Sequence, residues 1–231
     1  AAAEKHKVRR FVQISSIVAY GNSAEGELNE EQPVHADGGS YVLTKLASEH
    51  AVLAATANSP MELVIIRPGD VYGPGSRPWV ILPIEAINKG QFMLPAKGQG
   101  FFRPIFISDL IRGIALAVST KEAAGEIFNL SCEGYMTTAE FFSHHYQWMN
   151  KRGPLKVSTG LAMFAASAAT KLAQMTGGVN EASTATIVQL CTKSWFSIAK
   201  AERVLGWKPE VSFEDGMQQS KQWAQAQGLI K

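Results

Sequence analysis

A short run of apolar residues between two charged ones, Glu62–Arg67, is the strongest structural signal in the sequence. A continuous apolar run of this length is typical of a strand that is buried on both faces of a sheet. An alanine-rich helix pattern precedes it from Tyr41 to about Ala57, with Ser40 in the position of an N-terminal cap. Before that helix, Arg10–Ser16 is a β-rich run that ends in small polar residues. A strand, a helix and a strand in this order predict a parallel crossover unit and hence an α/β fold.

The rest of the chain continues to alternate between helices and short strands. A helix is predicted from about 79 to 89, and the β-like segment Pro104–Ile107 leads into a helix capped by Ser108 or Asp109. Ile127–Leu130 has the pattern of a further strand, and Thr137-x-x-Glu140 has the spacing of a capping box. The last third of the chain is predicted to be mostly helical. The length of 231 residues allows one large domain or two small ones.

The composition is that of a globular chain and disfavours two classes of partner. Apolar residues make up 46% and charged residues 18%, whereas a disordered chain would have fewer apolar residues and more net charge. The 22 basic residues barely exceed the 20 acidic ones, so no basic excess is available for nucleic acid. No apolar run reaches the roughly 18 residues that a membrane-spanning helix needs, and no signal peptide is recognisable. We therefore expect neither nucleic-acid binding nor stable membrane insertion.

Cysteine and histidine usage favours a cytoplasmic protein without a metal site. Cys132 and Cys191 are the only cysteines, and they lack zinc-type spacing with histidine. His144 and His145 are adjacent, so on a helix they point about 100° apart and cannot both face one metal. A reduced, cytoplasmic location and no bound metal are the expectations.

Tyr41 and Lys45 stand four residues apart on the predicted helix, so both side chains project from one face. A free tyrosine titrates near pH 10, so use as a base at neutral pH asks for about three units of depression, or about 4 kcal/mol. An ammonium in a partly desolvated site supplies energy of that order. Ser15 and Ser16 follow the preceding strand at its carboxyl end, where open α/β sheets place their ligands. The pair alone would also fit an exposed helix face.

Three ordered motifs, Phe11–Gly21, Tyr41–Lys45 and Arg67–Pro74, carry a family resemblance. In this order and spacing they resemble the extended short-chain dehydrogenase/reductases. That group includes NAD-dependent sugar epimerases and dehydratases and 3β-hydroxysteroid dehydrogenase-like enzymes. The resemblance continues through Phe106–Leu110 and Leu205–Pro209 and so covers nearly the whole chain. It implies the C-terminal part of a Rossmann-like parallel sheet and a smaller, mostly helical substrate domain.

The resemblance also implies roles for individual residues. Tyr41 would be the general acid/base that moves the hydroxyl proton while hydride passes between substrate and nicotinamide. Lys45 would lower the pKa of that tyrosine and bind the nicotinamide ribose. Ser16 would hold the substrate oxygen and polarise a carbonyl, with Ser15 structural. Backbone groups just after the predicted strand Glu62–Arg67 would contact the nicotinamide carboxamide, and these are Pro68, Gly69 and Val71.

Two departures from the family pattern bear on the substrate. Members that use nucleotide-diphosphate sugars often have asparagine where this chain has Asp70, whose negative charge would repel a diphosphate. The position at which they tend to carry a phosphate-binding arginine holds Phe102, and Arg103 follows one residue later. Arg103 is therefore either a substrate-binding residue or a surface ion-pair partner. An apolar or small hydroxy or keto compound is favoured as substrate, and Phe101, Phe102 and the apolar stretch 161–175 would suit it.

The dinucleotide-binding glycine turn of the family is absent from the sequence. We therefore expect an N-terminally truncated chain, with 1–75 as the C-terminal half of an NAD(P)-binding domain, returns to that domain near 104–130, and a mainly substrate-binding region over 76–231. Two functions follow. One is an NAD(P)-dependent oxidoreductase or epimerase, including a nucleotide-sugar epimerase or dehydratase as an alternative. The other is a non-catalytic binding or scaffold remnant.

The sequence leaves several properties open. These are the identity of the substrate, the reaction outcome among oxidation, epimerisation, dehydration and isomerisation, and the choice between NAD and NADP. The helix that carries Tyr41 pairs subunits in many members of the family, so a homodimer through that helix is a further expectation. A small-molecule substrate is the main expected partner.

Overall fold

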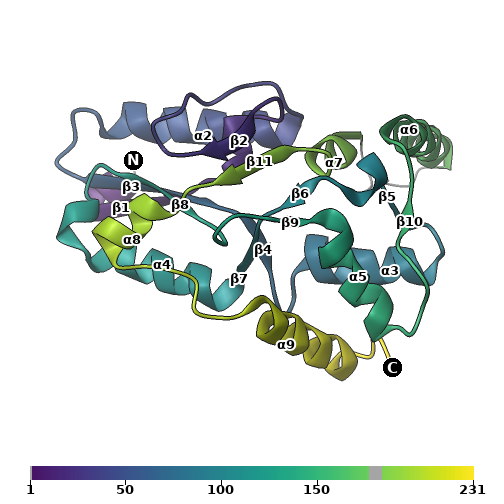
Figure 1. Cartoon of the computed structure of the whole chain (residues 1–231). Helices are drawn as coiled ribbons and strands as arrows, with labels where there is room; N and C mark the ends of the chain where they lie inside the picture. The colour runs from purple at the N-terminus through teal and green to yellow at the C-terminus, as the bar shows by residue number, and fades with distance from the viewer. Residues whose placement is uncertain (1, 177–183) are drawn as a thin grey trace. The chain divides into compact units, whose positions relative to one another are not determined.

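The computed structural model describes residues 2–176 and 184–231, with side chains described over 2–170 and 184–231 (Figure 1). The chain divides into two compact units. Unit 1 consists of Ala1–Tyr72, Arg103–Gly134 and Trp195–Gly216, and unit 2 consists of Gly73–Phe102, Tyr135–Ser194 and Met217–Lys231. The assignment of cofactor binding to one part and substrate binding to the other stays a prediction.

A parallel three-stranded sheet forms the centre of unit 1. Its strands are β1 (Arg10–Ile14), β3 (Glu62–Pro68) and β8 (Ile127–Leu130), in the order β1-β3-β8. In the register, Ile14 lies beside Ile66, and Ile66 lies beside Phe128. The middle strand is buried along almost its whole length, as its continuous apolar sequence predicts. The α/β class and the parallel pairing expected from the sequence are thus confirmed.

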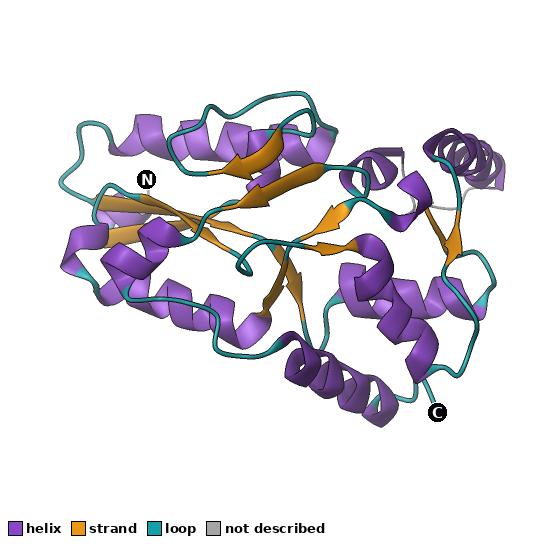
Figure 2. Cartoon of the chain, in the orientation of Figure 1, coloured by secondary structure: helices purple, strands orange, loops and turns teal. Residues whose placement is uncertain are grey.

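Helices cover both faces of this sheet (Figures 1 and 2). Helix α2 (Ser40–Thr56) lies on one face, and α4 (Ile107–Ser119) and α8 (Ala199–Leu205) lie on the other. The core under α4 and α8 is made of branched aliphatic side chains from the sheet together with Trp207, which is fully buried. The remaining elements of unit 1 are α1 (Ala2–Lys5), the 3-10 helices η1 (Ile17–Tyr20) and η4 (Lys121–Ala123), and the strands β2 (Glu25–Leu28), β4 (Asp70–Tyr72) and β7 (Pro104–Phe106).

Unit 2 is mostly helical and has an aromatic core. Phe102, Phe141 and Phe142 are almost completely buried and pack against Trp79. The helices are η2 (Arg77–Ile81, a π turn), α3 (Leu82–Asn88), η3 (Ala96–Gly98), α5 (Thr138–Trp148), α6 (Thr159–Thr176) and α7 (Thr184–Gln189). The strands are β5 (Met93–Leu94), β6 (Phe101–Phe102), β9 (Met136–Thr137) and β10 (Leu155–Lys156). Two elements run across the division between the units, β11 (Lys193–Phe196) and α9 (Phe213–Ala226).

Two predicted helix caps differ from the structure. Helix α2 begins at Ser40 itself, its N-cap residue is Gly39, and no side chain caps it. Helix α4 begins at Ile107, so Asp109 lies inside the first turn instead of capping it. The Asp109 carboxylate accepts hydrogen bonds from the backbone N–H groups of Glu210 and Val211, both at 3.0 Å. Asp109 therefore ties two distant segments of unit 1 together.

The Thr137–Glu140 capping box is present as predicted. The Thr137 hydroxyl accepts from the Glu140 N–H at 3.1 Å, and the Glu140 carboxylate accepts from the Thr137 N–H at 2.6 Å. Among the residues that the structure describes, no helix combines the length and the apolar character that crossing a membrane requires. Over the same residues, no group of three or more His, Cys, Asp and Glu side chains is arranged to hold a metal.

Candidate active site

The structure brings Ser16, Tyr41 and Lys45 together at the carboxyl end of β1, all within unit 1. These three residues form the catalytic trio predicted from the sequence. Ser16 is the residue from which η1 begins, and its hydroxyl accepts a hydrogen bond from the Val18 N–H at 3.3 Å. Tyr41 and Lys45 occupy the first turns of α2. The apolar residues beside them in the sequence, Val42 and Leu46, pack against Val18 and Ala19 of η1. Because this contact holds η1 against α2, it also holds the Ser16 hydroxyl near the Tyr41 phenol.

Tyr41 is the most accessible member of the trio, with 57% of its surface exposed. Partial desolvation raises the pKa of its phenol above the ordinary 10.0, the Asp70 carboxylate adds to this rise, and a hydrogen bond with Ser16 opposes it. The phenol is therefore protonated at neutral pH in this arrangement. It can donate a proton to a substrate oxygen, and it needs additional positive charge nearby to act as a base.

Lys45 does not supply that charge at close range in the structure. Its ammonium lies 5.6 Å from the centre of the Tyr41 ring and donates a hydrogen bond to the Ile14 carbonyl at 3.1 Å. The lowered tyrosine pKa implied by the family resemblance is thus not a property of this arrangement. The ammonium stands at the end of β1, however, and a modest change of rotamer in a four-carbon side chain would alter its distance from the phenol.

Pro68 ends β3 and Gly69 follows it, both residues are buried, and Val71 is half-buried in β4. The Gly69 N–H donates to the Leu130 carbonyl at 2.8 Å, so this donor is engaged within unit 1. A Cβ atom at Gly69 would lie 2.5 Å from the Arg103 carbonyl oxygen and 2.7 Å from the Ser131 hydroxyl. Glycine is therefore required here by the close packing of the protein on itself, which is a different reason from the ligand approach that the sequence suggested. Contacts of these three residues with a carboxamide stay a prediction.

Asp70 and Arg103 form a buried ion pair. The Asp70 carboxylate accepts a hydrogen bond from the backbone N–H of Arg103 at 3.1 Å and lies 3.3 Å from the Arg103 Nε. Arg103 is only 3% exposed, so it is not a surface ion-pair partner. Because the guanidinium balances the carboxylate inside the protein, the charge of Asp70 is a weaker argument against a diphosphate substrate than the sequence suggested. Substrate binding by Arg103 stays a prediction that its burial does not favour.

Phe102 lies in the aromatic core of unit 2, stacked on Phe141 with ring centres 3.9 Å apart. Its neighbour Phe101 stacks on Tyr135 at 3.5 Å. The apolar stretch 161–175 belongs to α6, where Leu161 and Phe164 are exposed while Ala162 and Ala166 are buried. The side chains of 171–175 lie outside the described residues. The described part of this stretch thus has both an exposed and a buried apolar face.

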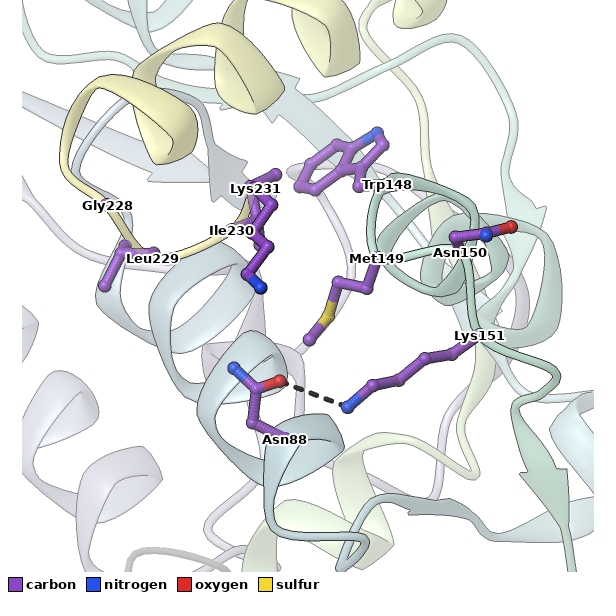
Figure 3. Close-up of a pocket in the computed structure, with 9 residues that line it drawn as sticks. All are labelled: Asn88, Trp148, Met149, Asn150, Lys151, Gly228, Leu229, Ile230 and Lys231. Atoms are coloured by element: carbon purple, nitrogen blue, oxygen red, sulfur yellow. Dashed lines mark hydrogen bonds between the residues drawn. The ribbon is translucent and has the colours of Figure 1, made fainter.

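Two of the cavities formed by described residues lie in unit 2, and no predicted catalytic or cofactor-binding residue lines either of them. One has a volume of about 490 Å³ and is shown in Figure 3, where Lys151 donates a hydrogen bond to Asn88 across it. The other has a volume of about 540 Å³ and a largely apolar lining that includes Trp79, Leu82 and Phe92. The second cavity is the better candidate for an apolar ligand because aromatic and aliphatic side chains form most of its wall.

Sequence reasoning missed a buried polar group that adjoins the trio. Glu49 on α2 and Arg67 on β3 form an ion pair, and Tyr20 at the end of η1 donates a hydrogen bond to the Asn129 side chain at 2.9 Å. One signal was available in the sequence. Glu49 lies eight residues after Tyr41 and four after Lys45, and a charged residue in the interior of an otherwise Ala- and Leu-rich helix calls for a partner.

Comparison with known proteins agrees with this geometry. The model of the NAD dependent epimerase/dehydratase family matches residues 1–131. The chain is 28% identical over 235 residues to the uncharacterized protein y4nL of Sinorhizobium fredii. The aligned region covers 98% of this chain and 66% of y4nL. It is 33% identical over 143 residues to dTDP-glucose 4,6-dehydratase of Streptomyces niveus. This aligned region covers 60% of this chain and 42% of that enzyme. It is also 25% identical to sterol-4-alpha-carboxylate 3-dehydrogenase (decarboxylating) of Candida albicans, over 96% of this chain and 67% of the relative.

Solved structures share the fold. UDP-glucuronic acid 4-epimerase from Bacillus cereus, solved in complex with NAD, superposes with a TM-score of 0.73 at 22% identity, covering 98% of this chain and 64% of that one. An epimerase from Methanothermobacter thermautotrophicus gives a TM-score of 0.76 at 21% identity, with 98% and 62% coverage. The chain thus spans about two thirds or less of the length of most of these proteins. Because the family model matches more than half of the chain and the parallel sheet carries its motifs, the chain belongs to the NAD dependent epimerase/dehydratase family.

Proposed function

We propose that the complete protein is an NAD(P)-dependent oxidoreductase or epimerase that acts on a hydroxyl or keto group, with Tyr41 as its general acid/base. The observation that carries this proposal is the exposed Tyr41 phenol beside the Ser16 hydroxyl, with Lys45 one helical turn away. Family membership supports the reaction class.

The donors at the carboxyl end of β1 fit a nicotinamide nucleotide. The Lys45 ammonium already reaches this strand end through its bond to the Ile14 carbonyl, and the hydroxyls of Ser16 and Tyr41 lie beside it. An ammonium is suited to ribose hydroxyls, and the carboxyl ends of parallel strands are where such sheets bind ligands. NAD, when bound, supplies the nicotinamide carbon that takes up or returns hydride.

The residues of the chain would move the proton that accompanies the hydride. In the reducing direction, Tyr41 Oη donates its proton to the substrate carbonyl oxygen, which the Ser16 hydroxyl also polarises. The raised pKa of the phenol suits this acid role. In the oxidising direction, the same oxygen accepts the hydroxyl proton, and for this step Lys45 must approach the phenol to stabilise the phenolate. Lys45 is therefore expected to change its hydrogen-bond partner between the protonated and the deprotonated form of Tyr41.

An apolar or small hydroxy or keto compound is the substrate class that we propose. The position of a phosphate-binding arginine is taken by Phe102, which is buried among aromatic rings and offers no cation there. The sterol dehydrogenase relative supports this class, whereas the dehydratase and epimerase relatives support a nucleotide sugar. The nucleotide sugar is therefore kept as the alternative substrate.

The test is turnover by the complete protein with NAD or NADP and either a hydroxysteroid carboxylate or dTDP-glucose. Tyr41→Phe is expected to abolish turnover while the circular dichroism spectrum stays unchanged, because the phenyl ring keeps the packing and loses the proton. Tyr135→Phe is a matched control, since Tyr135 is an exposed tyrosine outside the trio. A normal kcat for Tyr41→Phe would reject the mechanism. Turnover of dTDP-glucose without turnover of the steroid would reject the substrate class alone.

A non-catalytic binding module is the second candidate. The observation in its favour is that Lys45 is engaged with the Ile14 carbonyl while the pKa of Tyr41 is raised. If that arrangement persists when cofactor is added, the complete protein should show no turnover with any hydroxy or keto compound. Detectable turnover that depends on Tyr41 excludes this candidate.

A further inference from the structure

Helix α2 carries a carboxylate in its buried stripe. Val42, Leu46 and Glu49 are the residues of this helix that the structure buries, and their spacing places them on one face. The first two make apolar contacts with η1. Glu49 instead receives two hydrogen bonds from Arg67 of β3, at 3.0 Å from Nε and 2.7 Å from Nη2. Both side chains are almost completely inaccessible, at 3% and 4% exposed.

Arg67 links the two helical segments that carry the trio, α2 and η1. Through Glu49 it holds α2, which carries Tyr41 and Lys45. Its guanidinium lies over the ring of Tyr20, 4.7 Å from the ring centre, and Tyr20 ends the 3-10 helix that begins from Ser16. Arg67 itself precedes Pro68 at the end of β3. One buried cation thus contacts both segments whose side chains must meet.

We propose that the Glu49–Arg67 ion pair is a positioning device, which sets the rotation of α2 about its axis and thereby holds Tyr41 and Lys45 against Ser16. This inference rests on the proposed function for its catalytic consequence. Apolar contacts have no preferred direction, so Val42 and Leu46 alone would allow α2 to rotate or slide by a fraction of a turn. A two-bond fork between a guanidinium and a carboxylate has a defined geometry and removes that freedom.

Stability alone is a poor explanation for this pair. Replacing a buried ion pair with well-packed apolar residues is often neutral or stabilising, because desolvation offsets the attraction between the charges. A pair of apolar side chains would therefore complete the buried stripe of α2 equally well. What an apolar pair would lack is control over rotation, and a displacement of about 1 Å at a catalytic group can lower the rate by about two orders of magnitude.

A second ion pair in the same sheet provides a matched control. Arg10 and Glu62 lie side by side at the amino ends of β1 and β3, with 2.7 Å between Arg10 Nε and Glu62 Oε2. Arg10 is buried and also donates to the carbonyls of Ala117 and Thr120. Loss of this pair should lower stability as loss of the other does. It should leave the trio in place because it lies at the opposite end of the strands.

Three variants separate positioning from stability. Glu49→Gln keeps the shape of the side chain and removes its charge. The double variant Glu49→Leu/Arg67→Met replaces the whole pair with apolar side chains. It leaves no unpaired buried charge, so the test does not depend on whether Glu49→Gln folds. Glu62→Gln is the control. In the 231-residue chain, nuclear Overhauser effects between the Tyr41 ring and the Ser16 methylene protons report the trio directly. In the complete protein, kcat and KM are measured beside the thermal midpoint.

We expect both α2 variants to lose or weaken the Tyr41–Ser16 cross-peaks and to lower kcat by about tenfold or more, with little change in KM. The double variant should do so without losing thermal stability relative to Glu49→Gln. Glu62→Gln should lower the thermal midpoint and keep both the cross-peaks and kcat. Retention of the cross-peaks in the folded double variant would overturn the inference. The cross-peaks need no turnover, so this result is distinct from a failure of the proposed function, which Tyr41→Phe tests.

Discussion

His145 on α5 is a buried histidine whose charge is controlled by its surroundings. Its Nε2 lies 2.8 Å from the Trp79 carbonyl, and the rings of Phe141, Phe142 and Trp148 surround it. Desolvation lowers the pKa of His145 from 6.5 to about 4, and the Trp79 carbonyl only partly opposes this. The imidazole is therefore neutral at physiological pH, with Nε2–H as the donor to the carbonyl.

The burial of His145 predicts acid destabilisation. Because its pKa is lower in the folded protein than in the unfolded chain, the unfolded chain binds the proton first as the pH falls. Stability should be lost from about pH 6.5 down to about pH 4, by about 3 kcal/mol in total. Chemical denaturation at a series of pH values measures this free energy of unfolding.

Two substitutions isolate the contribution of His145. His145→Gln keeps a donor for the Trp79 carbonyl and has no titratable group, so its stability should vary much less over the same interval. His50→Gln on α2 replaces an exposed histidine and should behave like the unmodified chain. The carboxylates Asp37 and Glu140 have lowered pKa values, so their own effects belong to lower pH. An unchanged pH dependence in His145→Gln would contradict the prediction.

Residues whose partners lie far along the chain were the ones that sequence reasoning misread. Asp109 bonds to the backbone about a hundred residues later, and Gly69 packs against the Arg103 carbonyl. Arg103 itself is buried against Asp70. A sequence pattern registers neighbours up to about one helical turn away, so it identifies residue types at these positions and not the contacts that they make.

At the scale of helices and strands, local chemistry was a better guide. The middle strand was predictable because a strand covered on both faces needs an unbroken apolar run. The Thr137–Glu140 box was predictable because both of its hydrogen bonds close within one turn. Ser40 had the right residue type for a cap, yet α2 starts one residue earlier than expected and Gly39 takes the cap position. Element boundaries are thus less determined by sequence than the elements themselves.

The two helix starts predict different responses to the same kind of substitution. Thr137→Ala removes the side-chain acceptor at the start of α5 and should lower the free energy of unfolding by about 1 kcal/mol. Ser40→Ala removes a hydroxyl that caps nothing and should change stability by only a few tenths of a kcal/mol. Urea denaturation of the two variants beside the unmodified chain measures both values. Equal losses in the two variants would contradict the assigned caps.

At the scale of the whole molecule, the chain holds the trio but lacks a recognisable glycine turn for the pyrophosphate of a dinucleotide. In this class of fold, that turn and the helix N-terminus after it provide the phosphate contacts. That Ser16, Tyr41 and Lys45 lie together could be predicted from sequence because their motifs are short and ordered. The buried Glu49–Arg67 pair could not, since Arg67 becomes a neighbour of Glu49 only when β3 packs against α2. The homodimer expected through α2 stays a prediction.

The absence of a phosphate-binding turn predicts weak cofactor binding by the 231-residue chain. Lys45, Tyr41 and Ser16 would contact only the nicotinamide end of NAD, and the pyrophosphate would remain in water. Titration of NAD or NADP followed by tryptophan fluorescence, with calorimetry as a check, should give a dissociation constant weaker than the micromolar range. Any residual binding should decrease in Lys45→Met, because its ammonium is the cationic member of the trio. Micromolar binding that survives Lys45→Met would show that another part of this chain binds the cofactor.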